Sequence, residues 1–125
     1  MIKQIPSKEI ETYLKSNSKS VLLDVRTEEE WSVDGKPEGK KIGLETYFLT
    51  IQFADKTFNK NFIEDFKKLK IRKDQEVLTM CMGGVRSQAA AELLIKEEYK
   101  CTNISDGFLG NGQNPGWKNS NLPQK

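Results

Sequence analysis

Short apolar segments alternate with amphipathic ones along this chain, and this alternation restricts the fold more than any other feature of the sequence. The clearest apolar segment is residues 21–26, Val-Leu-Leu-Asp-Val-Arg. A nearly continuous apolar run of this length is typical of a strand buried on both faces of a parallel sheet. Strands that are separated by helices imply crossovers that cover the sheet. The sequence therefore predicts an α/β fold, with a mostly parallel sheet and helices on both faces.

Helix-capping residues and the spacing of apolar residues locate the other helices and strands. Ser7 is in position to cap a first helix, and residues 27–30, Thr-Glu-Glu-Glu, form a capping box that opens a short helix containing Trp31. The strand register between residues 34 and 58 is left open by the sequence. Beyond an opening segment at 2–5, we expect strands at 46–51, 77–81 and 102–105, helices at 59–70 and 88–98, a loop at 34–43, and an irregular tail from residue 106 held by its aromatic residues.

Composition excludes several classes of function. The chain has 125 residues, enough for one domain spanning 1–125, and its 20 basic and 18 acidic side chains nearly balance. The basic residues are scattered, so a nucleic-acid partner is not indicated. The apolar runs are too short for a membrane span, and the opening residues argue against a signal peptide. The lack of histidine removes a histidine base and mixed His–Cys zinc sites, and we expect no metal and no cofactor.

One segment has the composition of a reactive site. Cys81 stands at the end of the strand predicted at 77–81, and Met-Gly-Gly-Val-Arg-Ser follows it into a helix. In parallel sheets, reactive groups lie outside the carboxyl ends of the strands. Inward-pointing backbone N–H groups and the start of a helix both stabilise a thiolate, and Arg86 adds a permanent positive charge. We therefore expect Cys81 to be a nucleophile in an anion-binding loop.

Two reactions fit such a loop: attack on a sulfane sulfur to give a persulfide, and attack on phosphorus or arsenic to give a covalent oxyanion intermediate. Only residues 82–85 lie between Cys81 and Arg86. A tyrosine-phosphatase-like pocket needs a larger ring, because its backbone must hold three phosphoryl oxygens. The small ring favours a single sulfur atom. A phosphatase or arsenate reductase, and a binding module without catalysis, remain as alternatives.

The chain resembles the single-domain rhodaneses, which are sulfurtransferases. The resemblance rests on Cys-x-x-Gly-x-Arg-Ser beginning at Cys81, on residues 22–26 followed by Glu30 and Trp31, and on the Gly-Phe pair at 107–108 followed by a tryptophan in the tail. These elements occur in the family's order and span most of the chain. The sequence departs from the family at 34–39, Asp-Gly-Lys-Pro-Glu-Gly, where members often have Gly-His-Ile-Pro-Gly-Ala.

The resemblance implies that Cys81 accepts a sulfane sulfur from a small anionic donor such as thiosulfate and holds it as a persulfide. The sulfur would then pass to a thiol or cyanide acceptor, or to a sulfur-relay protein. Arg86 would brace the loop or attract the donor. The terminal sulfur would be held by the backbone N–H groups of Met82, Gly83, Gly84, Val85 and Arg86.

The resemblance also assigns supporting roles beside the loop. Asp24, Arg26 and Ser87 would support it, with Asp24 and Arg26 at the end of a neighbouring strand and Arg26 paired with Glu30. Cys101 lacks such surroundings, and we expect it to be a small, partly buried residue rather than a resolving thiol. Both cysteines are expected to be reduced, in a cytoplasmic compartment. The aromatic residues at 47, 48, 53 and 58 are expected in the core or at its rim rather than at a substrate mouth.

Overall fold

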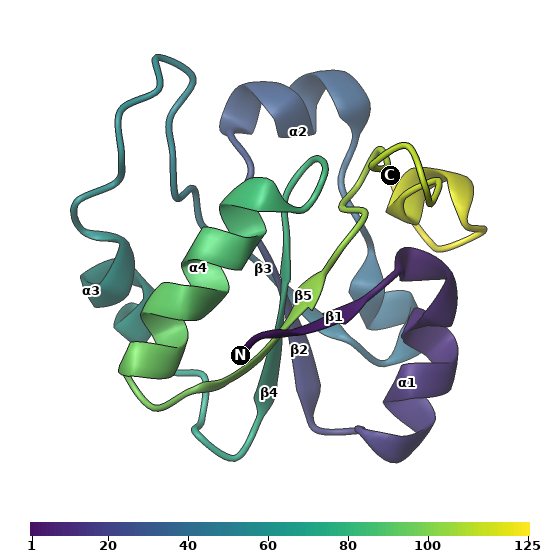
Figure 1. Ribbon diagram of the computed structural model, residues 1–125, viewed down its shortest axis with the longest axis horizontal. Helices are drawn as coiled ribbons and strands as arrows, with labels where there is room; N and C mark the ends of the chain where they lie inside the picture. The colour runs from purple at the N-terminus through teal and green to yellow at the C-terminus, as the bar shows by residue number, and fades with distance from the viewer.

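The structure, a computed structural model that describes residues 1–125, is built on five parallel strands (Figure 1). Across the sheet they run β1-β5-β4-β2-β3, and every neighbouring pair is parallel. The predicted α/β class is confirmed. The strands are β1 Lys3–Ile5, β2 Ser20–Asp24, β3 Glu45–Phe48, β4 Glu76–Met80 and β5 Lys100–Ile104; the helices are α1 Ile10–Ser16, α2 Glu28–Asp34, α3 Phe62–Lys68 and α4 Val85–Lys96, with 3-10 turns at Ser7–Glu9, Gly39–Ile42 and Trp117–Asn119.

Each face of the sheet has its own hydrophobic core, because successive side chains of a strand point to opposite faces. On one face, Phe62 and Phe66 of α3 and Leu94 of α4 pack against alternate residues of β2 and β4. On the other face, Ile10 of α1 packs with a cluster that includes the buried Trp117 of the tail. Figure 1 shows α3 and α4 on one side of the strands and α1 on the other. No helix here combines the length and the apolar character needed to cross a bilayer.

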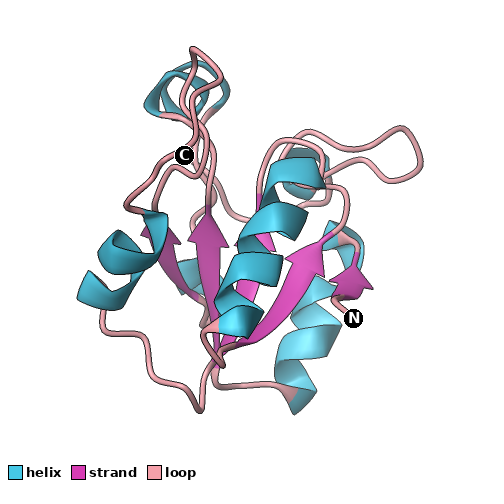
Figure 2. Ribbon diagram, turned by 60° about the vertical axis from the view of Figure 1, so that its left-hand side comes forward, coloured by secondary structure: helices cyan, strands magenta, loops and turns pink.

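The register of the sheet determines which segments meet at its carboxyl edge. Asp24, the last residue of β2, is paired with Met80, the last residue of β4. The amide of Val25 continues the pairing by donating to the Met80 carbonyl at 2.8 Å. All strand arrows point to this edge in Figure 2. The segments after β2 and β4 therefore leave the sheet side by side, with Arg26 close to the loop that begins at Cys81.

Two predictions near the first helix and the middle strand need correction. Ser7 does not cap a helix, because its amide and its hydroxyl both donate to the buried carboxylate of Asp106 at 2.9 Å, and α1 begins only at Ile10. β3 covers 45–48 rather than 46–51. Residues after β3 still bond to the end of β2, as when the Ile51 amide donates to the Val25 carbonyl at 3.2 Å, but outside the regular ladder.

Three further elements have a boundary that differs by two residues or more from the one expected. α4 begins at Val85 rather than after Ser87, because Gly84 takes a left-handed conformation, φ 104°, and starts the helix directly behind the turn. α3 is shorter than predicted, and β5 begins at Lys100, so that Cys101 lies inside this strand rather than before it. The capping box at Thr27 and Glu30 is present as predicted, and the tail is held by the Trp117 indole, which donates to the Pro123 carbonyl at 2.8 Å.

Candidate active site

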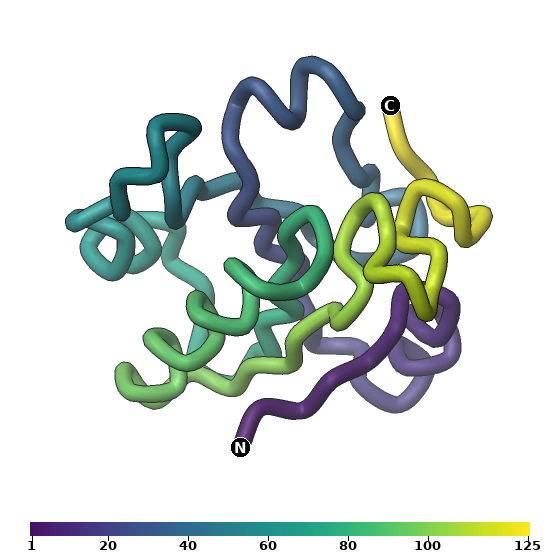
Figure 3. Tube along the Cα trace, turned by 45° about the horizontal axis from the view of Figure 1, so that its top comes forward, coloured from purple at the N-terminus to yellow at the C-terminus, as the bar shows by residue number.

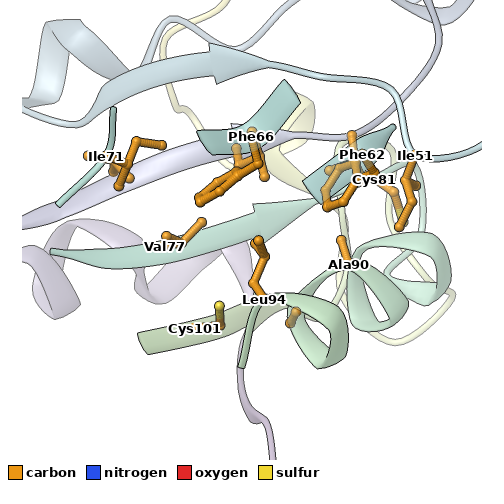
Figure 4. Close-up of a cluster of buried hydrophobic side chains, with 13 residues drawn as sticks. Ile51, Phe62, Phe66, Ile71, Val77, Cys81, Ala90, Leu94 and Cys101 are labelled. Atoms are coloured by element: carbon orange, nitrogen blue, oxygen red, sulfur yellow. The ribbon is translucent and has the colours of Figure 1, made fainter. Parts of the chain in front are cut away.

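Cys81 follows β4 directly, and its sulfur faces the core layer beneath α4. The residue is 1% exposed and packs with Ile51, Phe62 and Ala90 (Figure 4). Two polar groups nevertheless reach the sulfur: the Gly84 amide donates to Sγ at 3.1 Å, and the Ser87 hydroxyl lies 3.3 Å from it. Both contacts favour a negative charge on sulfur, since a hydrogen bond to the charged form stabilises that form. Ser87 is itself fully buried, which holds its hydroxyl in place.

The segment after β5 covers the loop from the other side. The Phe108 amide donates to the Cys81 carbonyl at 2.8 Å, and the Leu109 amide donates to the Met82 carbonyl at 3.1 Å. A Cβ on Gly107 would lie 2.5 Å from the Met82 carbonyl, so only glycine allows this close approach. Figure 3 shows the turn after β4 beside the segment after β5. Backbone bonds to a second segment therefore fix the conformation of the cysteine loop.

Asn103 of β5, which the sequence reasoning missed, also contacts the loop. Its side chain is 2% exposed, and Nδ2 donates to the Gly84 carbonyl at 3.0 Å. The available signal was a polar amide within the strand predicted at 102–105, but nothing in the sequence shows that this amide meets the turn after a different strand.

Arg86, in the first turn of α4, is engaged by a carboxylate. Its two terminal nitrogens bond to the two carboxylate oxygens of Glu30, each at 2.8 Å. Burial raises the pKa of Glu30, but hydrogen bonds from Arg86 and the Thr27 backbone outweigh burial and lower it to about 2. The hydrogen bonds that Arg86 donates to Glu30 raise the pKa of Arg86. Of the two roles expected for Arg86, this geometry supports bracing: the pair joins α4 to α2 across the site.

The prediction that Arg26 pairs with Glu30 is wrong. Arg26 instead pairs with Asp24 at 2.9 Å, and both side chains are fully buried. Its guanidinium also donates to the Gly35 carbonyl at 2.9 Å and lies over the Phe108 ring, 4.2 Å from the centroid. Burial raises the pKa of Asp24, against the opposing effects of the hydrogen bonds and charge of Arg26. Arg26 thus links the end of β2 to the segment that covers the cysteine loop.

Cys101 cannot serve as a resolving thiol for Cys81. It is paired with Val77, four positions before Cys81 on β4, so the two cysteines are separated by roughly 13 Å at the rise of a strand. Disulfide formation needs Cα atoms within about 7 Å. Burial, together with the charge of Glu76, raises the pKa of Cys101 to about 12. Cys101 is a buried thiol, as expected, and both cysteines are free.

The other groups near the site do not form a metal centre. No three Cys, Asp or Glu side chains lie close enough together to hold an ion. A cavity of about 330 Å³ opens beside the Arg86–Glu30 pair, bounded by Phe53 and Lys56 of the loop after β3. Phe53 and Phe58 are exposed rather than in the core, whereas the aromatic residues of β3 are half-buried. Phe53 therefore borders a cavity at the start of α4.

Comparison with known proteins identifies the family of this fold. Residues 8–111 match the model of the rhodanese-like domain. The protein RP600 of Rickettsia prowazekii (strain Madrid E) is 38% identical over 125 residues, covering 98% of this chain and 97% of its own. The chain belongs to the rhodanese-like domain family.

Solved structures extend the comparison to the fold. The crystal structure of Rv0390 from M. tuberculosis superposes with a TM-score of 0.82 at 29% identity, covering 98% of this chain and 96% of that one. A rhodanese-like domain protein from Staphylococcus aureus gives a TM-score of 0.67 at 22% identity, with 99% of both chains covered. The second likeness concerns the fold alone. Together they show that a rhodanese-like fold accounts for nearly the whole chain.

Proposed function

We propose that this protein is a sulfurtransferase in which Cys81 carries a sulfane sulfur as a persulfide. The observation that carries the proposal is the setting of Sγ, which accepts a hydrogen bond from the Gly84 amide and lies 3.3 Å from the Ser87 hydroxyl. These two groups stabilise an anionic sulfur without a histidine, which the chain lacks. Sulfur transfer between anions requires no proton transfer, so the absence of a general base near Cys81 is no obstacle.

The first half-reaction with thiosulfate is a displacement at sulfur. The Cys81 thiolate attacks the sulfane sulfur, a new S–S bond forms, the bond to the sulfonate sulfur breaks, and sulfite leaves with the electron pair. The product is a Cys81 persulfide anion. In the second half-reaction cyanide or a thiolate attacks the terminal sulfur, and the Cys81 thiolate leaves. Charge and atoms balance in both steps, and no external oxidant or reductant takes part.

The backbone N–H groups of residues 82–86 are proposed to receive the terminal sulfur. Only the Gly84 amide among them bonds to Sγ, so the other amides of the loop are not occupied by that atom. The ring is small, with four residues between Cys81 and Arg86. Such a ring suits one added sulfur better than the three oxygens of a phosphoryl group. A thiosulfate-like anion is the proposed donor, and a thiol, cyanide or a sulfur-relay protein the proposed acceptor, in a reducing cytoplasmic compartment.

Intact mass spectrometry after exposure to thiosulfate tests the proposal. The wild type and the matched variant Cys101→Ser should each gain one sulfur atom and produce thiocyanate from cyanide. Cys81→Ala should do neither. Full activity of Cys81→Ala, or persistence of the adduct after Cys81 is replaced, would show that another residue carries the sulfur.

The same proteins separate the two alternatives. Hydrolysis of an aryl phosphate by the wild type, lost in Cys81→Ser, would indicate an oxyanion-processing enzyme. A wild type that forms no persulfide with thiosulfate, polysulfide or a low-molecular-weight persulfide would indicate a binding module.

A further inference from the structure

Asn103 is an unusual residue for the place it occupies. It is paired with Thr79 in the register of β5 and β4, and its side chain is 2% exposed. It shares a face of β5 with Cys101, which belongs to the apolar layer beneath α3 and α4. An aliphatic side chain would fill this position without the cost of desolvating an amide. A buried amide here therefore calls for a specific partner.

All polar atoms of the Asn103 side chain are occupied, and their orientation is determined. Nδ2 donates to the Gly84 carbonyl at 3.0 Å and to Oε1 of Gln4 at 2.8 Å. Oδ1 accepts from the Thr79 hydroxyl at 3.3 Å. A backbone carbonyl can only accept, so the nitrogen of the amide must face Gly84. The bond to Gly84 is the contact that joins this network to the cysteine loop.

Gly84 is the residue whose orientation matters most for the sulfur. Its N–H points at Sγ of Cys81, 3.1 Å away, and its φ of 104° lies where other residues are strained. Two groups of the same segment contact it: the Ser105 carbonyl lies so close that an added Cβ at Gly84 would be 2.2 Å from it, and the Asn103 amide donates to the Gly84 carbonyl. The Gly84 N–H and carbonyl belong to the two peptide groups that meet at its Cα, so while Asn103 holds the carbonyl, the N–H can turn away from the sulfur only if the preceding peptide group rotates and changes φ of Gly84.

We infer that Asn103 is a positioning residue: through its bond to the Gly84 carbonyl it holds the Gly84 amide against the sulfur of Cys81. The inference deepens the proposed function and rests on it, because an anionic Cys81 is useful only in a protein that uses this sulfur as a nucleophile. Asn103 touches neither the sulfur nor the mouth of the site, so its effect passes entirely through Gly84.

The test is the rate at which iodoacetamide alkylates Cys81, followed by intact mass as a function of pH. The substitution Asn103→Leu keeps the size of the side chain and removes the N–H donor. Asn103→Ala also removes the donor and serves as a second variant in case leucine does not fit the site. Thr79→Val is the matched control, since it removes a hydrogen bond of the same network but leaves the donor to Gly84. Circular dichroism and urea unfolding establish that each variant is folded.

We expect both Asn103 variants to be alkylated about five- to tenfold more slowly than the wild type at pH 7, with the pH midpoint of the alkylation rate moved upward. Thr79→Val should be less stable in urea unfolding, but the pH midpoint of its alkylation rate should equal that of the wild type. The charged groups around the loop, Arg86, Glu30, Asp24 and Arg26, are the same in every variant. Unchanged midpoints in folded Asn103 variants, or an equal shift in Thr79→Val, would overturn the inference. Alkylation needs no sulfur donor, so this result is independent of whether the wild type forms a persulfide.

Discussion

The Arg86–Glu30 pair should contribute measurably to stability, and Glu30→Gln tests how much. The glutamine keeps the shape and one oxygen for the Thr27 amide, but it loses the charge that Arg86 contacts through two bonds of 2.8 Å. Lowering the pKa of Glu30 from 4.5 to about 2 corresponds at most to about 3 kcal/mol. The side chains of both partners are 23% exposed, and solvent screening reduces this figure. We expect a loss of about 1–2 kcal/mol, or a decrease of about 4–8 °C in Tm.

The sign of the pH dependence follows from the direction of the shift. Because the pKa of Glu30 is lower in the folded protein, the stabilisation is fully present above pH 4.5 and is lost as the pH falls toward about 2. Glutamine does not titrate, so the difference in unfolding free energy between wild type and Glu30→Gln should shrink across this window.

Urea unfolding followed by circular dichroism, at pH 7 and at steps down to pH 3, measures this difference. Glu29→Gln is the matched control, since Glu29 is exposed and adjacent and makes no ion pair, and its change should stay within about 0.5 kcal/mol. The reasoning is refuted if the two variants lose equal stability at pH 7, or if the deficit of Glu30→Gln does not change between pH 5 and pH 3.

Three further substitutions probe the loop and its supports. Gly84→Ala places a Cβ 2.2 Å from the Ser105 carbonyl, so thiocyanate production should fall by about two orders of magnitude or more while helix content stays close to that of the wild type by circular dichroism. Asp24→Asn leaves the fully buried Arg26 without its counter-charge and should cost about 3–5 kcal/mol in urea unfolding. Because the pKa of Cys101 is raised to about 12, Cys101→Ser should react with iodoacetamide at pH 8 at the wild-type rate, and in the folded wild type the mass of a single adduct should appear.

The sequence predicts those parts of the fold that are determined by residues close together in the chain. The Thr27 capping box forms within one turn of helix. The apolar composition of residues 21–26 is sufficient to indicate a strand that is buried on both faces. Cys81 at the end of a strand, followed by two glycines, is likewise a local pattern. The sequence does not predict the exact start of α4, because the start depends on the left-handed Gly84, which packs closely against the Ser105 backbone of a segment distant in the sequence.

The errors concern partners that are distant in the sequence. The family resemblance was taken to imply a pair between Arg26 and Glu30, but Arg26 turns into the core toward Asp24, and Glu30 pairs with Arg86. Two arginines and two carboxylates near one loop can pair in either way, and only the direction in which the chain leaves β2 decides between them. Asn103 was missed for the same reason, because its partner Gly84 follows a different strand.

The two ion pairs bear on how an anionic donor is held. Arg26 is neutralised by Asp24 in the core, and the terminal nitrogens of Arg86 are occupied by Glu30. Both guanidinium charges are therefore countered by a carboxylate, although Nη1 of Arg26 is buried without a hydrogen-bond partner. Under the proposed function, this assigns most of the attraction for a sulfur anion to the amides of residues 82–86 and to the Ser87 hydroxyl. Uncharged N–H and O–H groups bind an anion well only when they are held in the right direction, because a hydrogen bond weakens steeply once it is misaligned. This explains why so much of the structure around Cys81, from the Phe108 amide to the arginine pairs, acts on the shape of the loop rather than on its charge.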